Sequence, residues 1–467
     1  MMKKLLLCLL IFTNLAAKSQ NVVSDSISYD VFGKVSVYKG SQTPKSLILF
    51  ISGDGGWNSG VVDMAKALVP LNAMVAGINI IHYLKMIKSS KSECYYPASD
   101  FENLSLFLQK KYKFPQYVKP VLIGYSSGAT LAYAALAQAP ENTFAGAISL
   151  GFCPDIEIDR PLCKGNGLTM HVLKPKKSYY IEKVKNLSAP FFALQGTGDQ
   201  VCPFQATEAY LKDMPNANLV KLTRVGHGFG VQKNWMPQFK ASFQTILAHQ
   251  NLVFHKPAES LPKALPAGLP IIMNLAGNSS NPEMAFFISG DGGWTDFDDS
   301  IAKELARSGI SSIGLDAQKY FWNQKTPEQT AADVSKILSY YSRLWNKTEI
   351  RMVGYSFGAD VMPFIVRRLP ENLKSQMKSV TMLSPSETSD FEIHVADMLG
   401  IGGSSKSYNV ISETKSLKEV KTVCVFGDKE DSATAKNFKT DGLVVKFLEG
   451  NHHFDKNFPK IVNMIRE

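Results

Sequence analysis

The sequence lacks most of the features that mark a metal site, a nucleic-acid interface or a membrane-spanning protein. Its 467 residues contain no low-complexity tract, and the six cysteines and eight histidines form no CxxC pair and no cluster with metal-ligand spacing. No basic block indicates nucleic-acid recognition. Beyond the first residues, no apolar run is long enough to cross a bilayer. We therefore expect no metal, no cofactor and no nucleic-acid partner.

The first residues have the pattern of a secretory signal peptide. Lys3 and Lys4 precede an apolar run over residues 5–12, and small residues follow it. A lipoprotein signal is rejected because Cys8 lies inside the apolar run, where a lipobox would place small residues before it. The sequence predicts that residues 1–19 are removed and that the mature protein is exported.

The formal net charge is +10, and three lysines of the signal segment leave about +7 on the mature chain. Ordinary solubility explains such a charge. The alternative is peripheral attraction to an anionic membrane surface.

Five cysteines follow the signal segment, and an exported protein can form disulfides. Cys153 and Cys163 enclose a short, loop-like segment, which favours their pairing, and Cys94 is the rival partner. Cys424 lies in the apolar run TVCVF and is expected to be a core thiol.

One string of eight residues, FISGDGGW, occurs twice, at 50–57 and at 287–294. Later landmarks recur in the same order: Gly290 − Gly53 gives 237, Ser356 − Ser126 gives 230, and His452 − His227 gives 225. The offset between the two halves therefore changes by only twelve residues, from 237 to 225, along the whole repeated unit. We therefore expect two homologous domains, at residues 28–250 and 271–467, joined by the proline-rich linker 251–270.

Each half alternates short apolar runs with helical stretches, which predicts an α/β fold: a mostly parallel sheet flanked by helices. The helix expected at 327–344 begins with a Pro at its first position, and Thr326 and Gln329 can form a capping box. The expected strands are 46–52, 74–81, 119–124, 144–150, 190–195 and 218–224, then 284–289, 310–315, 349–353, 378–383, 420–426 and 442–448.

A G-x-S-x-G motif stands between strand and helix in each half, as GYSSG at 124–128 and GYSFG at 354–358. In that context the motif is typical of a nucleophile elbow, in which glycines permit the tight turn that presents the serine. Ser126 and Ser356 are the candidate nucleophiles.

A serine needs a base and an orienting acid, which follow it along the chain in this type of fold. Asp199 and His227 follow strands of the first half. In the second half, alignment of Gly196 with Gly427 makes Glu430 the counterpart of Asp199. The neighbouring carboxylates Asp428 and Asp431 stay open as alternatives, and His452 is preferred to His453 because Asn-His-x-Phe matches Gly-His-x-Phe.

The FISGDGGW turn follows the first strand of each unit, where such a fold builds part of its oxyanion hole from backbone N–H groups. Two alternatives explain the acidic residue of this turn: it caps the following helix, or it binds a cationic group of the substrate. The residues expected to form the hole or contact the substrate are Asp54, Gly55 and Ser127 in the first half and Asp291, Gly292 and Phe357 in the second.

The second half resembles the AcvB/VirJ family of bacterial virulence proteins. The resemblance is carried by ISGDGGW (288–294), DAQKYFW (316–322), GYSFGAD (354–360) and GNHHFD (450–455). It covers residues 270–467, and the preceding half resembles the extra N-terminal domain of the longer, AcvB-like members. One departure is that this N-terminal half keeps its own Ser126, Asp199 and His227.

The resemblance implies a periplasmic α/β-hydrolase that removes the lysyl group from lysyl-phosphatidylglycerol, with a link to virulence-associated secretion. It implies Ser356 as nucleophile and His452 as base. An ammonium group on the substrate would give Asp291 or Asp360 a role. The alternatives are a serine carboxylesterase or peptidase with another small substrate, and a non-enzymatic binding protein of a secretion system.

Overall fold

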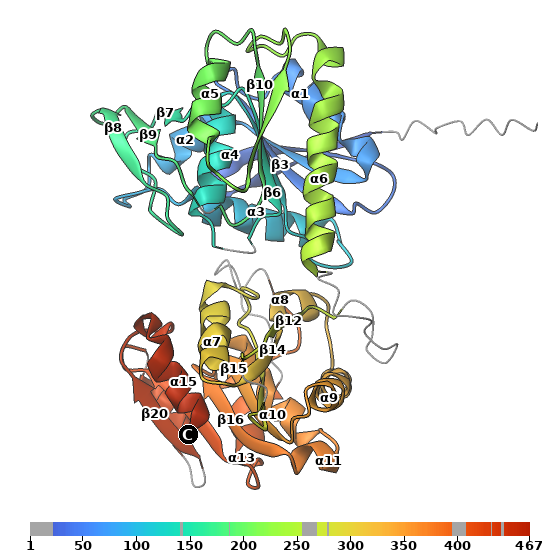
Figure 1. The fold of residues 1–467 in the computed structure, drawn as a ribbon, viewed down its shortest axis with the longest axis vertical. Helices are drawn as coiled ribbons and strands as arrows, with labels where there is room; N and C mark the ends of the chain where they lie inside the picture. The colour runs from blue at the N-terminus through green and yellow to red at the C-terminus, as the bar shows by residue number, and fades with distance from the viewer. Residues whose placement is uncertain are drawn as a thin grey trace, which may run out of the picture.

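A computed structural model describes residues 22–140, 143–185, 187–254, 269–277, 280–394, 408–430, 432–439 and 443–467. Two large sheets lie in separate halves of the chain (Figure 1), which we call the N-terminal half, residues 22–254, and the C-terminal half, residues 269–467. The signal segment, most of the linker and Asp431 lie outside the described residues, so the predictions made for them are not addressed by the structure.

The N-terminal sheet has eight strands in the order β1-β2-β4-β3-β5-β6-β10-β11. The β1–β2 and β2–β4 pairs are antiparallel, and all other neighbours are parallel. The strands are β1 Val23–Tyr29, β2 Gly33–Lys39, β3 Ser46–Ile51, β4 Ala73–Ile78, β5 Val121–Tyr125, β6 Gly146–Leu150, β10 Phe191–Gly196 and β11 Ala217–Leu222.

Helices cover both faces of this sheet, and strand β3 shows why. All of its side chains are buried, and alternate residues face opposite ways. Leu47 and Leu49 join the core beneath α2–α5, whereas Ile48 and Phe50 join the core beneath α1 and α6. The helices are α1 Ser59–Lys66, α2 Ile80–Ile87, α3 Pro97–Lys111, α4 Ser127–Gln138, α5 Phe204–Leu211 and α6 Met236–Phe254.

The C-terminal sheet repeats this order without the first strand, as β12-β14-β13-β15-β16-β19-β20. Only the β12–β14 pair is antiparallel. The strands are β12 Ile271–Asn274, β13 Glu283–Ile288, β14 Ser311–Leu315, β15 Glu349–Tyr355, β16 Met377–Leu383, β19 Thr422–Gly427 and β20 Val444–Leu448.

Helices α7 and α15 cover one face of the C-terminal sheet, and α8, α9, α10, α13 and α14 contribute to the core on the other. Their bounds are α7 Asp296–Arg307, α8 Ala317–Tyr320, α9 Pro327–Leu344, α10 Phe357–Arg367, α11 Glu371–Lys374, α13 Val410–Lys415, α14 Ser432–Phe438 and α15 Phe458–Arg466. Small sheets are formed by β7 Asp155–Ile156, β8 Met170–Lys174 and β9 Ser178–Ile181, and by β17 Thr388–Ser389 and β18 Tyr408–Asn409.

The repeated tryptophan packs on a glycine of the neighbouring strand in both halves. A Cβ placed on Gly77 of β4 would lie 1.9 Å from the Trp57 ring, and one on Gly314 of β14 would lie 2.1 Å from the Trp294 ring. Since no side chain fits between ring and strand, the end of the FISGDGGW turn is held flat against the sheet.

The two halves contact each other through α3 and the segment after α8. Trp322 is buried against Leu106 and Tyr117. Its indole Nε1 donates to the carbonyl of Phe114 at 3.2 Å, and Lys110 forms an ion pair with Glu392 at 3.3 Å. Residues far apart in the sequence thus share one small core.

The disulfide expectation is wrong in its preferred pairing. Cys94 bonds to Cys163, and Cys153 bonds to Cys202. The Cys94–Cys163 bond is possible because Tyr95 forms a bridge with the segment that ends at Cys163, so the rival partner is the one brought close. Cys424 is a buried free thiol, as expected, and burial raises its pKa to about 12.

The α/β fold with two tandem sheets is confirmed, and a strand lies at each of the twelve expected places. Helix α9 spans 327–344 and has the expected capping box. Strands β1, β2 and β12, on the antiparallel side of each sheet, were not expected. The N-terminal sheet begins at Val23 rather than 28, and α6 continues to Phe254, four residues into the expected linker.

Gly77→Ala is expected to destabilise the protein, because its methyl group would overlap the Trp57 ring. Overpacking of this kind costs about 1–3 kcal/mol. Gly230→Ala is the matched control, since a Cβ there meets nothing within 4 Å. Chemical denaturation measures both, and an unchanged midpoint for Gly77→Ala would contradict the packing described.

Candidate active site

Ser126 lies in the sharp turn between β5 and α4. Its backbone has φ 56° and ψ −123°, a conformation that L-residues rarely adopt. The turn is closed by backbone contacts: a Cβ on Gly124 would lie 1.9 Å from the carbonyl oxygen of Gly128, and one on Gly128 would lie 2.3 Å from that of Ser52. Both glycines are therefore required for the helix to start this close to the sheet.

His227 joins Ser126 to Asp199 in the N-terminal half. Its Nε2 lies 2.9 Å from Ser126 Oγ, and its Nδ1 lies 2.8 Å from Asp199 Oδ2. Asp199 follows β10 and His227 follows β11, so the two side chains meet the serine at the carboxyl edge of the parallel strands. The structure thus brings together all three residues predicted for this half.

The carboxylate of Asp199 is held rigidly. The backbone N–H groups of Val201 and Cys202 donate to Oδ1 at 2.9 and 2.8 Å, and Gln195 Nε2 donates to Oδ2 at 3.2 Å. The Cys153–Cys202 disulfide ties this turn to the loop after β6. The sequence analysis did not single out Gln195. Its position directly before Gly196, which ends the strand, is the signal that could have identified it.

Ser356 occupies the equivalent turn between β15 and α10, with φ 50° and ψ −120°. Gly354 and Gly358 make the same close contacts: a Cβ on either would lie 2.3 Å or less from a backbone oxygen. The geometry of the elbow is therefore repeated.

Glu430, rather than Asp428, meets the histidine of the C-terminal half. Its Oε1 lies 2.6 Å from His452 Nδ1, whereas Asp428 accepts from the N–H of Gly450. Ser384 Oγ and the N–H of Gly427 also donate to Glu430 Oε2, at 2.9 and 2.6 Å. Burial alone would raise the pKa of Glu430, but these hydrogen bonds outweigh it and lower the pKa.

The serine contact is the difference between the halves. Among the residues that the structure describes, Ser356 Oγ has no hydrogen-bond partner, although the His452 ring lies 5.3 Å from the ring of the adjacent Tyr355. The His452 side chain is 45% exposed, against 18% for His227. In the C-terminal half the histidine is thus more exposed to solvent, and the hydrogen bond between serine and histidine is missing.

His453 packs edge-on against Phe297, with ring centroids 5.2 Å apart. Burial lowers its pKa, with a contribution from the neighbouring His452. The two adjacent histidines therefore have different surroundings, as the sequence alignment of the halves indicates.

The FISGDGGW turn lies against the serine in both halves. A Cβ on Gly53 would lie 3.0 Å from Ser126 Cβ, and one on Gly290 would lie 3.5 Å from Ser356 Cβ. The hydroxyls of Ser52 and Ser289 accept hydrogen bonds from the N–H groups of Ile80 and Ala317 and so fix the turn to the first residue of α2 and of α8. These two serines were not singled out from the sequence.

The N–H groups expected in the oxyanion hole, those after each serine, belong to Ser127 and Phe357. Within the described ranges neither N–H donates to a backbone or side-chain acceptor, which leaves each available. The carbonyl of Gly55 accepts a hydrogen bond from Asn58, and Gly292 lines a cavity between the two halves.

Asp54 and Asp291 do not cap the following helices, so that alternative is wrong. The caps are Asn58 for α1 and Thr295 for α7. Both carboxylates are exposed. Burial raises the pKa of Tyr355, and the negative charges of Asp298, Asp291 and Glu430 raise it further, which places Asp291 within electrostatic range of the residue before Ser356.

Comparison with known protein families shows to which family the chain belongs. The profile of a bacterial virulence protein, VirJ, matches residues 45–149 and 282–467. The chain belongs to the VirJ family. Both serine elbows lie within the matched regions, whereas Asp199 and His227 lie outside them, and the resemblance noted in the sequence is confirmed.

No curated protein matches this VirJ-family chain. Solved structures similar to it include an esterase domain from Rhodothermus marinus, at 12% identity over 48% of this chain and 97% of that one, TM-score 0.33. A dienelactone hydrolase from Anabaena variabilis has 15% identity over 49% and 98%, TM-score 0.35. An alpha-beta serine hydrolase homologue from Coxiella burnetii has 16% over 49% and 96%, TM-score 0.31.

The described residues contain no group of three or more His, Cys, Asp or Glu residues placed to hold a metal ion. None of their helices is both long and apolar enough to span a bilayer.

A fluorophosphonate probe is expected to label Ser126 faster than Ser356, because only Ser126 already shares its proton with an imidazole. Ser126→Ala and His227→Gln should each remove most of the rapid labelling, as measured by mass spectrometry of the labelled peptides. The exposed Ser59→Ala is the control. Faster labelling of the Ser356 peptide would contradict the difference seen between the halves.

Proposed function

We propose that this chain is an exported serine hydrolase that cleaves the aminoacyl ester of lysyl-phosphatidylglycerol or a similar aminoacylated phospholipid. The observation that carries the proposal is the continuous chain Ser126 Oγ–His227–Asp199, with links of 2.9 and 2.8 Å, on a positive-φ elbow. A binding protein has no need of a serine, a base and an acid in this order.

The chemistry follows from these positions. The serine oxygen attacks the ester carbonyl while the imidazole takes its proton, and the carboxylate stabilises the imidazolium that forms. The N–H after the serine and the N–H groups of the FISGDGGW turn would hold the oxyanion, an effect worth several kcal/mol in such sites. The imidazole then protonates the departing lipid hydroxyl, and water releases the amino acid. We assign these roles to Ser126, His227 and Asp199, and to Ser356, His452 and Glu430.

The choice of substrate rests on the charges of the protein and on its membership of the VirJ family. Exposed carboxylates in the oxyanion turn oppose a developing anion, so their presence is best explained by a cationic group on the substrate. Asp54 and Asp291 are such residues. A lysyl ester supplies two ammonium groups, and the net charge of about +7 on the mature chain favours an anionic bilayer surface.

Export to the periplasm is part of the proposal. It is supported by the signal-like first residues and by the two disulfides, which persist in an oxidising compartment. An association with a secretion system is suggested by the kinship with the virulence protein alone.

The test is incubation of the mature protein with lysyl-phosphatidylglycerol vesicles, with released lysine measured over time. Wild type should release lysine, and the double variant Ser126→Ala/Ser356→Ala should lose at least about 10³-fold in rate. The single variants assign the reaction to one half or to both. Absence of lysine release by wild type, together with hydrolysis of a neutral ester, would replace this proposal by a carboxylesterase of another substrate.

Asp291→Asn is expected to lower kcat/KM for the lysyl lipid by about twofold to fivefold, the value of an exposed ion pair. It should leave a neutral ester unaffected, since that substrate has no ammonium group. Asp299→Asn, in the first turn of α7 and paired with Lys303, is the control. Equal losses on both substrates would mean that Asp291 acts on the turn itself and not on the substrate.

A further inference from the structure

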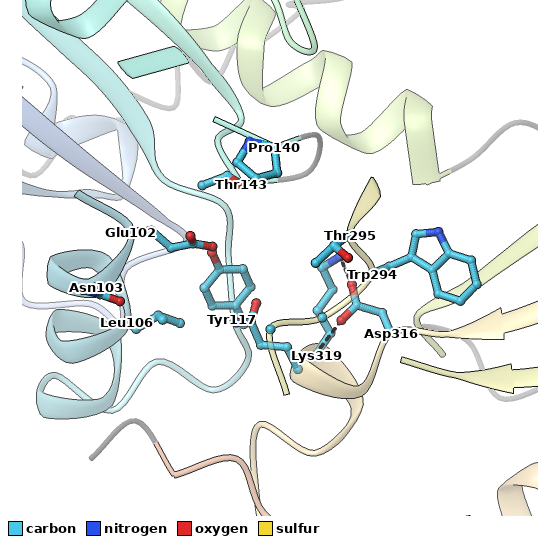
Figure 2. A pocket seen from close by; sticks show the side chains of 13 residues that line it. Glu102, Asn103, Leu106, Tyr117, Pro140, Thr143, Trp294, Thr295, Asp316 and Lys319 are labelled. Atoms are coloured by element: carbon cyan, nitrogen blue, oxygen red, sulfur yellow. Dashed lines mark hydrogen bonds and ion pairs between the residues drawn. The ribbon is translucent and has the colours of Figure 1, made fainter. Parts of the chain in front are cut away.

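A cavity of about 150 Å³ lies between the two halves, and residues 292–295 at the end of the FISGDGGW turn form part of its lining. Figure 2 shows α3 residues Glu102 and Leu106 and the side chain of Tyr117 on one side, and Thr295, Asp316 and Lys319 on the other. That volume holds several waters or one small organic molecule. Both halves contribute, so the cavity exists only in the tandem chain.

Three polar groups lining the cavity have no partner within the described part of the chain. Gln318 is 4% exposed and its Nε2 makes no hydrogen bond. Tyr117 is 5% exposed, and no hydrogen bond of its hydroxyl is found. Glu102 has neither an ion pair nor a hydrogen bond, and burial alone raises its pKa to about 7. Such groups are costly to leave unsatisfied inside a protein.

The remaining charges of the cavity are already matched. Asp316 caps α8 and forms an ion pair with Lys319. Glu102 is therefore the one carboxylate of the cavity lining without a counter-charge among the described residues. Burial raises the pKa of Tyr117, and the negative charges of Glu102 and Asp316 raise it further, so its hydroxyl lies within electrostatic range of both carboxylates.

We propose that this cavity binds a small molecule carrying a protonated primary amine and a hydrogen-bond acceptor, the chemistry of a free amino acid. The ammonium would face Glu102 and the oxygen of Tyr117, and the acceptor would take a hydrogen bond from Gln318 Nε2. A divalent cation fits less well, because such ions need several oxygen ligands and Asp316 is occupied. The inference does not depend on the proposed hydrolysis.

Isothermal titration calorimetry of the full mature chain tests it, with L-lysine, L-alanine and ethanolamine as amines and acetate as the probe without one. We expect saturable binding of at least one amine and none of acetate. Glu102→Gln should weaken binding at least tenfold, and Gln318→Leu should weaken the amino acids more than ethanolamine. Glu208→Gln, exposed on α5, is the control, and thermal unfolding checks that each variant is folded.

Two further variants separate this site from the serine sites. Ser126→Ala/Ser356→Ala should bind the amine as wild type does, even though it cannot hydrolyse an ester. Binding that is lost in Asp291→Asn but kept in Glu102→Gln would locate the amine at the oxyanion turn and overturn the proposal. Absence of any saturable amine binding by wild type would overturn it as well, and would leave the cavity to water.

Discussion

Everything at the two serine sites depends on a contact between backbones that no side chain could permit. The strand before each serine and the helix after it meet where Gly124 faces Gly128 and where Gly354 faces Gly358. Because the helix begins so near the sheet, the intervening residue is forced to a positive φ and stands above the strand ends. The strain at that residue is sustained by the packed sheet around it, which explains why the same elbow survives twice in one chain.

The acids show two ways of holding a carboxylate in place. The carboxylate of Asp199 accepts hydrogen bonds from two successive backbone N–H groups, those of Val201 and Cys202. A disulfide bonds this turn to the neighbouring loop. Glu430 has a longer side chain and depends on the hydroxyl of Ser384 and one backbone N–H. The extra methylene places the second carboxylate at the end of a more flexible arm. This difference accompanies a histidine that is more open to solvent in the C-terminal half.

Motifs and strands in the interior were readable from the sequence because each carries a local signal. Runs such as LILFI predict a strand buried on both faces, and Gly-Tyr-Ser-x-Gly fixes the turn that follows another. Strands β1, β2 and β12, on the antiparallel side of each sheet, are only partly buried and have no such signal. The pairing of Cys153 with Cys202 depends on two loops meeting in space, and the cavity beside Glu102 depends on how the halves dock, so neither could be derived from spacing along the chain.

The contact made by Trp322 is not shared by the other repeat. Subtraction of the 237-residue offset that relates Trp294 to Trp57 places Trp322 opposite Lys85, an exposed residue of α2. The two halves are therefore joined through a hydrophobic side chain on one of them, while the other has a charged side chain at the matching place. The contact between the halves thus depends on a position at which they differ. A C-terminal body standing alone would leave that indole in water.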